Sequence, residues 1–403
     1  MFQAENLGFN QENAASRAGS GGSNYRGSGL NPDGIPYQSI LMEFARDPFS
    51  THDKYDFETV QTYFLKPGDD LETVISQHAK IALDPEVEYV IEHPVKIRSL
   101  CYIIGNGAKI KIACPEHFGI EIYPRDHSPG IVGMWLVTFN NVVFERERSI
   151  PGGIIQSRTF FLCHGCNFLG ALGTAVSALA GGEVRGCHFF GCFKCVDSRS
   201  KFKVKVSHSV IETCMVGISA SGPVSVKHCQ GLSVYCFLFM LGAGKVEGNS
   251  VINPNKFYES ALTEMVSCYG KIVLPLATVH ISASPKHQYP HFEANVLTRC
   301  KVFVGARQGT FTPMLSSLSY TSIVADRDAF KSLNLNYTFH QTTTIWKLLS
   351  AADADFDHGT ARKCLCGDLH PCPVLKQLDY TSRVRPNPYD HSCDSRVFSD
   401  DEN

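Results

Sequence analysis

The residues best suited to chemistry lie near the C-terminus, where three cysteines and one histidine are closely spaced: Cys364, Cys366, His370 and Cys372. Cysteine thiolates and histidine nitrogens form the tetrahedral sets that proteins use to bind structural zinc. The Cys-x-Cys spacing places two ligands on one side of an extended chain, whereas a standard zinc finger arranges them around a tight turn. One zinc ion bound by these four residues is one prediction, and a reduced cysteine-rich loop without metal is the other.

A second chemical signal is the acidic end of the chain, where Ser399 directly precedes Asp400, Asp401 and Glu402. A serine followed by acidic residues is the substrate pattern of acid-directed kinases, and a phosphate would add nearly two negative charges there. We predict phosphorylation at Ser399. A solvated, unmodified tail is the alternative.

The most positive segment is the run KFKVKV at 201–206. Because side chains alternate between the two faces of a strand, Lys201, Lys203 and Lys205 are predicted to share one exposed face. That face is either a basic docking stripe for acidic protein or RNA, or simply a solvated surface. The formal net charge of −2 gives the whole chain no general attraction to nucleic acid.

Catalytic constellations are not apparent in the sequence. Hydrolases and lyases built on repetitive β folds need carboxylates that converge from neighbouring coils. Between residues 137 and 251, Asp197 is the one aspartate, and the glutamates do not recur at one position of the repeat. The sequence also lacks a Ser-His-Asp signature, a phosphate-binding glycine loop and a nucleotide fingerprint. We therefore predict no catalytic residues and no enzyme activity of its own.

The elements that would position these groups are short strands in a repeat. Pairs of apolar residues five positions apart recur along the middle of the chain, and their first members are 24, 21, 22 and then 40 residues apart: Phe139 and Phe144, Cys163 and Phe168, Val184 and Phe189, Val206 and Ile211, Val246 and Val251. Val226 lies halfway across the widest interval, with Leu232 one residue late for its pair. A period of 20 to 24 residues with such short strands is typical of a solenoid. We predict an all-β, single-stranded, right-handed parallel β-helix.

A solenoid needs caps, because its end coils expose unpaired backbone groups. The segment 69–83 has a helix start signal, with Asp69 as N-cap and Glu72 as its reciprocal partner. It is the predicted N-terminal cap, and residues 336–350 are the predicted last coil. The predicted organisation is a disordered region at 1–52, a β-helix at 53–350, and a Cys/His-containing segment with an acidic tail at 351–403.

Composition places the chain in a reducing compartment. No segment approaches the roughly 20 apolar residues that span a bilayer, and the N-terminus lacks a secretory signal, so no membrane association is expected. The 16 cysteines are therefore predicted to be reduced, and most of them to be buried.

Several segments, in the same order from about Tyr55 to the C-terminus, resemble the adenoviral early-region 1B large protein, also called the large T antigen of that region: YFLKPGDDLETVISQHAKIAL, CYIIGNGAKIKI, RGCHFFGC, FEANVLTRC, TTTIWKLL and FSDDEN. The first 50 residues do not obviously share this similarity. RGCHFFGC is also similar to the octamer of RNA-recognition modules, but the β-helix register predicts that Cys187 and Phe189 point inward.

The resemblance implies a viral regulatory adaptor in the host nucleus and host cytoplasm. Such proteins bind and repress the host tumour-suppressor transcription factor (tumour protein fifty-three). With the viral early-region 4 open-reading-frame-six protein they serve as substrate receptor of a host cullin–elongin ubiquitin ligase, and they support late viral mRNA export and host shutoff, with RNA as an indirect partner. The alternative is a β-helical minor capsid protein of the atadenovirus type.

Overall fold

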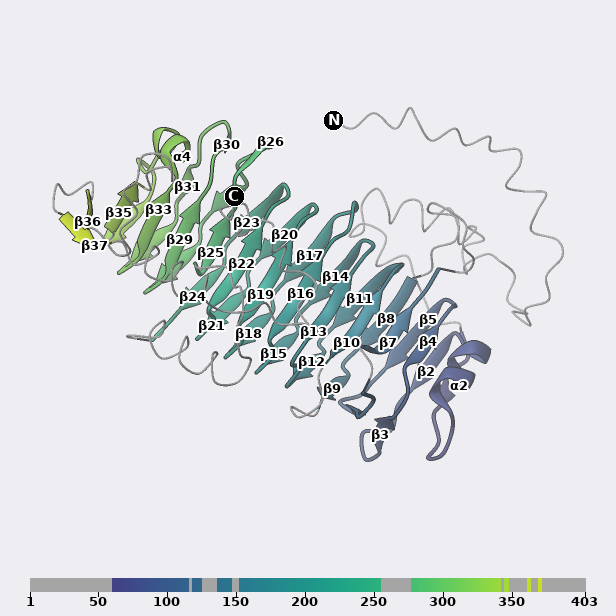
Figure 1. Ribbon diagram of the computed structural model, residues 1–403. Helices are drawn as coiled ribbons and strands as arrows, with labels where there is room; N and C mark the ends of the chain where they lie inside the picture. The colour runs from purple at the N-terminus through teal and green to yellow at the C-terminus, as the bar shows by residue number, and fades with distance from the viewer. Residues whose placement is uncertain are drawn as a thin grey trace, which may run out of the picture.

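The protein is a parallel β-solenoid, described by a computed structural model over residues 60–115, 118–124, 136–146, 152–254, 277–341, 344–347, 361–363 and 369–371 (Figure 1). Within these ranges, three sheets each contain eleven parallel strands. From β2 to β33, apart from β26 and β30, successive strands enter the first, second and third sheet in turn, so each of these coils contributes one strand to every sheet. The predicted all-β solenoid is confirmed. The predicted disorder of 1–52 and of the C-terminal tail concerns residues outside those described.

The three sheets are defined by their strands. The first sheet contains β1 Tyr63–Phe64, β2 Lys80–Ala82, β5 Cys101–Ile104, β8 Leu136–Asn140, β11 Phe160–His164, β14 Gly182–Arg185, β17 Val204–Ser207, β20 Val224–Lys227, β23 Gly244–Glu247, β27 His291–Glu293 and β31 Pro313–Met314. The second contains β3 Glu88–Ile91, β6 Lys109–Ile112, β9 Val143–Arg146, β12 Asn167–Leu169, β15 His188–Phe190, β18 Val210–Glu212, β21 Gln230–Leu232, β24 Ser250–Ile252, β28 Val296–Thr298, β32 Ser317–Ser319 and β34 Phe339–Gln341. The third contains β4 Val95–Ile97, β7 Phe118–Ile122, β10 Gly153–Ser157, β13 Thr174–Ala178, β16 Lys194–Ser198, β19 Val216–Ala220, β22 Cys236–Met240, β25 Val279–Ile281, β29 Lys301–Val304, β33 Ser322–Ala325 and β35 Thr344–Lys347.

Two small strand pairs lie outside these sheets. β26 Ser284–Gln288 pairs with β30 Arg307–Gln308 in parallel, and β36 Ala361–Lys363 pairs with β37 Leu369–Pro371 in antiparallel.

The core is a set of columns formed by the predicted apolar pairs. Cys163 lies in register with Phe139 on one side and Val184 on the other, so the first members stack in the first sheet. The second members stack in the second sheet, where the Phe168 and Phe189 rings lie 4.7 Å apart and nearly parallel. Each inward side chain therefore buries its surface against the same position of the next coil, which a single coil could not do alone.

One pair differs from the prediction at its second member. The inward position is Gly231, in register with Ile211 and Val251, and Leu232 points outward. A Cβ at Gly231 would lie 2.8 Å from the Phe237 ring, which occupies the space instead. At this coil, a side chain from the third sheet fills the core space that a second-sheet residue fills in other coils. The five-residue spacing of apolar pairs failed here for that reason.

The corner between the first and second sheets explains many of the cysteines. A residue with positive φ turns the chain there, such as Gly165, Gly186 or His208, and the residue after it points inward. Cys166 Sγ donates hydrogen bonds to the carbonyl oxygens of His164 and Phe139, one in its own coil and one in the preceding coil. The thiol thereby satisfies corner carbonyls. All eleven described cysteines are free and buried, which confirms the packing role predicted for most of them.

The N-terminal cap is the helix α2 Leu71–Gln77, which lies against β4 at the end of the third sheet (Figure 1). It is shorter than predicted, because Lys80–Ala82 form β2. Its N-cap is Asp70, which accepts from the Thr73 N–H, rather than Asp69. Glu72 is not a reciprocal capping partner: it accepts the N–H of Lys96 in the edge strand β4, at 2.9 Å. The helix therefore covers a sheet edge.

At the other end, β34 and β35 are the last strands of the second and third sheets, as predicted for residues 336–350. A short helix, α4 Arg327–Lys331, follows β33. Its N-cap Asp326 accepts from the N–H of Ala329 and, with its second oxygen, from the N–H of Ala306. This carboxylate thus ties the helix start to the corner of the preceding coil.

Candidate functional site

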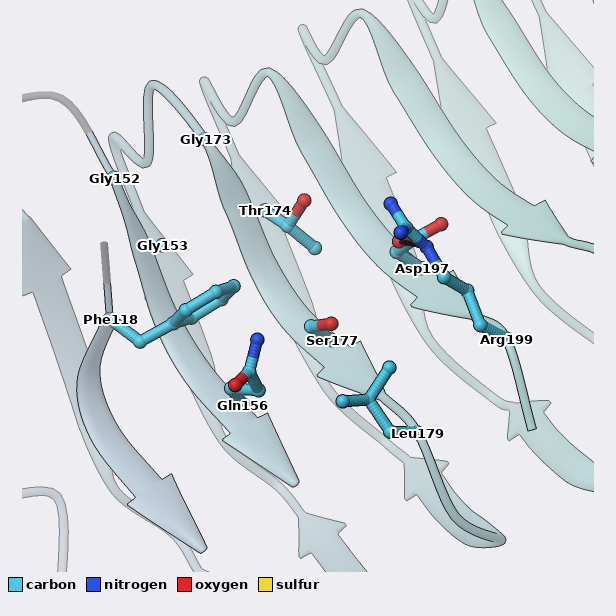
Figure 2. A pocket seen from close by; sticks show the side chains of 10 residues that line it. All are labelled: Phe118, Gly152, Gly153, Gln156, Gly173, Thr174, Ser177, Leu179, Asp197 and Arg199. Atoms are coloured by element: carbon cyan, nitrogen blue, oxygen red, sulfur yellow. Dashed lines mark hydrogen bonds and ion pairs between the residues drawn. The ribbon is translucent and has the colours of Figure 1, made fainter. Parts of the chain in front are cut away.

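A pocket of about 150 Å³ lies on the outer face of the third sheet (Figure 2). Its lining comes from β7, β10, β13 and β16 and the corners beside them: Phe118, Gly152, Gly153, Gln156, Gly173, Thr174, Ser177, Leu179, Asp197 and Arg199. Gln156, Ser177 and Asp197 occupy one outward column, because they are register partners in adjacent strands. Successive coils thus deliver three polar groups to one line.

Glycines allow close packing of the walls around the pocket. A Cβ at Gly153 would lie 2.3 Å from the Phe118 ring, and a Cβ at Gly173 would lie 2.7 Å from the backbone of Gly152. The Phe118 ring therefore lies over Gly153 and forms one wall. Asp197 and Arg199 form the opposite wall, with Arg199 Nε donating to Asp197 Oδ2 at 3.0 Å. Asp197 is 3% exposed, so this ion pair neutralises a buried carboxylate.

The carboxylates of this face cannot act as a hydrolytic pair. Glu121, Gln156, Ser177 and Asp197 follow one another in register, so the two acids are three coils apart. Three steps of about 4.8 Å give about 14 Å, whereas paired catalytic carboxylates lie about 5 to 9.5 Å apart. Glu121 also accepts a hydrogen bond from the Tyr123 hydroxyl at 2.6 Å. The pocket is therefore suited to binding rather than to acid–base catalysis.

A row of cationic side chains borders the pocket and was not predicted. The row is formed at the positions that directly follow five third-sheet strands: Arg98, Tyr123, Arg158, Leu179 and Arg199. The backbone N–H groups of the last four continue the ladder of hydrogen bonds from coil to coil. The guanidinium carbons of Arg98 and Arg158 each lie 5.2 Å from the Tyr123 ring centroid. The tyrosine is thus sandwiched between two cations.

The predicted basic stripe is only partly a strand face. Lys205 lies in β17, but Lys201 and Lys203 precede that strand, in the corner that begins at Arg199. Lys205 is half-buried and forms an ion pair with Glu183 at 3.5 Å, whereas Lys201 and Lys203 are exposed. Phe202, which strand alternation would place on the inner face between these lysines, is partly exposed and packs edge-on against Phe160. Whether the three lysines bind a partner stays a prediction.

The predicted zinc ligands lie outside the described residues, as does Ser399; the backbone of His370 alone is placed, in β37 opposite Arg362. Within the described part of the chain, no group of three or more His, Cys, Asp or Glu residues is arranged to hold a metal. Burial raises the pKa of Cys229 and of Cys300 to about 12, so these two thiols are protonated. Such thiols are poor metal ligands.

The segment similar to an RNA-recognition octamer follows the β-helix register. Phe189 is fully buried between neighbouring coils, and Cys187 Sγ donates to the carbonyls of Cys163 and Arg185. Their side chains cannot stack on bases. Among the helices that the structure describes, none is long and apolar enough to cross a membrane.

The fold and these surfaces define a β-solenoid protein whose described outer face offers a polar pocket and a cationic row. Comparison with known families is more specific. Residues 23–403 match the family model described as "Adenovirus EB1 55K protein / large t-antigen". The chain belongs to this family, and the match begins earlier than the similarity predicted from Tyr55.

Individual relatives agree with the family assignment. The chain is 34% identical to the E1B 55 kDa protein of Tree shrew adenovirus serotype 1, over 92% of this chain and 94% of that protein. It is 30% identical to the E1B 55 kDa protein of Human adenovirus B serotype 7, over 91% of this chain and 73% of that protein. A solved structure of PfbA, a surface adhesin of Streptococcus pneumoniae, aligns with TM-score 0.38 and 10% identity, over 68% of this chain and 86% of that one.

Proposed function

We propose that the protein is a viral early regulatory adaptor that binds and represses the host tumour-suppressor transcription factor. With the early-region 4 open-reading-frame-six protein, it acts as substrate receptor of a host cullin–elongin ubiquitin ligase. It further supports late viral mRNA export and host shutoff, and works in the host nucleus and host cytoplasm. The observation that carries the proposal is family membership over residues 23–403.

The shape of the solenoid is suited to this role. Eleven stacked strands extend over about 48 Å, at about 4.8 Å per coil. Because the coils share one core, the rod holds surfaces on different coils at fixed separations. A ligase subunit bound near one end and a substrate bound elsewhere would therefore stay at a constant distance. A receptor needs that geometry and no catalytic group of its own.

The test is co-expression of the full chain with and without the early-region 4 partner, with the half-life of the tumour suppressor as readout. We expect the half-life to shorten only when both viral proteins are present, and to recover when the proteasome is inhibited. Purified proteins should also form the corresponding complex. An unchanged half-life, together with the chain in purified virions, would favour the minor capsid protein instead.

A further inference from the structure

The cationic row at the edge of the third sheet carries charge that the adaptor function does not use. It contains Arg98, Arg158 and Arg199, all exposed, and continues along the next corner to Lys201 and Lys203. Among the residues that the structure describes, two acidic groups face it: Glu121, which accepts from Tyr123, and Asp197, which accepts from Arg199. Five cations against two carboxylates leave a net positive surface.

The row is also preorganised. Arg98 and Arg158 are held on the two faces of the Tyr123 ring, and the ring in turn is fixed by its hydrogen bond to Glu121. Arg199 is held by Asp197 through one of its five N–H donors. Long cationic side chains normally lose rotamer freedom on binding, and here part of that loss has already occurred. Such a row favours an anionic ligand.

The spacing of the arginines specifies the kind of ligand. Arg98 and Arg158 are two coils apart, and so are Arg158 and Arg199. Two coils correspond to about 9.6 Å, so the three arginines extend over about 19 Å. A ligand that contacts all three is therefore a chain with several anionic groups and not a single small anion.

We propose that this row binds the acidic tail of the protein itself, residues 399–403. Ser399 and Glu402 are three positions apart, with Asp400 and Asp401 between them. The carboxylates of Asp400, Asp401 and Glu402 give this tail a charge opposite to that of the row. Phosphorylation of Ser399 adds negative charge to the tail and strengthens its contact with the arginines of the row.

The chain is long enough for this contact within one molecule. The hairpin of β36 and β37 lies against β35, six coils from β16 and therefore about 29 Å away. Ser399 is 28 residues beyond Pro371. A random-coil chain of that length has an r.m.s. span of about 30 Å. The contact goes beyond the adaptor function and links tail phosphorylation to exposure of the row.

The experiment is site-specific photo-crosslinking on the full chain, with Phe398 replaced by benzoylphenylalanine. Crosslinked peptides are mapped by mass spectrometry before and after phosphorylation by an acid-directed serine kinase. We expect crosslinks to peptides that contain Arg158 or residues 199–203. Their yield should be independent of protein concentration, rise at least threefold on phosphorylation, and fall in high salt.

The charge-swap variant is R158E/K201E/K203E, which spares Arg199 because its loss would leave Asp197 buried without a counter-ion. The matched control is K245E/K286E/K331E, three exposed lysines elsewhere on the solenoid. The swap should lower the crosslink yield at least tenfold, and the control should not change it, at equal melting temperatures.

Crosslinks that map elsewhere, or that the charge swap leaves unchanged, would overturn the proposal. Crosslinks that appear only in dimers at high concentration would assign the row to a tail from a second copy. A single-stranded RNA oligomer that binds the row of the parent but not of the charge-swap variant, with no tail crosslinks to the row, would make the row an RNA surface instead.

Discussion

The inward position of Phe189 gives the most direct test of the register. We expect Phe189→Asp to be insoluble or unfolded and Phe190→Asp to remain folded, although the two residues are neighbours in β15. Phe189 is fully buried and stacks on Phe168 at 4.7 Å, whereas Phe190 is 37% exposed on the outer face. The pair differs in the direction of the side chain and in little else.

The expected magnitude follows from these contacts. Truncating a buried phenylalanine to alanine costs about 3–5 kcal/mol, and loss of an aromatic pair costs about 0.5–1.5 kcal/mol more. Phe189→Ala should therefore lower the free energy of unfolding by about 4–6 kcal/mol. A buried carboxylate without a partner adds several kcal/mol, and the sum reaches the about 5–15 kcal/mol that stabilises a typical domain.

The assay is soluble expression followed by circular dichroism during urea unfolding and heating. Phe189→Ala should unfold at clearly lower urea concentration than the parent, and Phe190→Asp close to the parent. A soluble Phe189→Asp variant with the melting temperature of the parent would refute the register.

Four further outcomes are expected. If the four predicted ligands near the C-terminus bind zinc, metal analysis should find about one ion per chain, and chelation should increase proteolysis there while sparing the solenoid; metal-free protein with an unchanged digest would contradict this. Ser399→Ala should weaken repression of the tumour suppressor in infected cells and Ser399→Asp should largely retain it, both at unchanged melting temperature. Arg307 donates hydrogen bonds to four backbone carbonyls at 2.8 to 3.0 Å, so Arg307→Met should cost about 3–5 kcal/mol, whereas Arg299→Met, at a partly exposed surface residue, should cost under about 1 kcal/mol in the same urea titration. Burial and the charge of Arg307 lower the pKa of His280 from 6.5 to about 3. As the pH falls below 6.5, the unfolded state alone takes up the proton, so the free energy of unfolding should drop by up to about 1.4 kcal/mol per pH unit. His280→Phe should flatten that slope.

The repeat was predictable because its signal is local. Val184 and Phe189 are both inward, and the five-residue interval between them holds one corner that turns the chain by a fixed amount. Residues at that interval recur in coil after coil, since parallel strands in register bury the same position each time. The helix next to β4 was predicted from its apolar spacing. Its capping contacts were predicted incorrectly, since the N-cap is Asp70 and not Asp69. Asp69 and Asp70 are both capping residues by type, and tertiary contacts decided between them.

The pocket and the cationic row were not predictable for a different reason. Arg98 and Arg158 are 60 residues apart in the chain, with irregular insertions between them, and become neighbours across Tyr123 only when three coils stack. The pocket walls beside them depend on Gly153 and Gly173, whose missing side chains let the Phe118 ring and the Gly152 backbone approach closely, which composition does not reveal.

The sequence by itself determined the class of fold, the inward columns and the family, because each depends on residue types at a regular interval. Only the tertiary structure decided which outward residues gather on one face. Outward positions carry no packing constraint that fixes their type, so Lys205 could be paired with Glu183 and Arg158 left exposed without any change in the apolar pattern. The surface of a solenoid is set by coil-to-coil register, and that register includes insertions whose length the repeat does not specify.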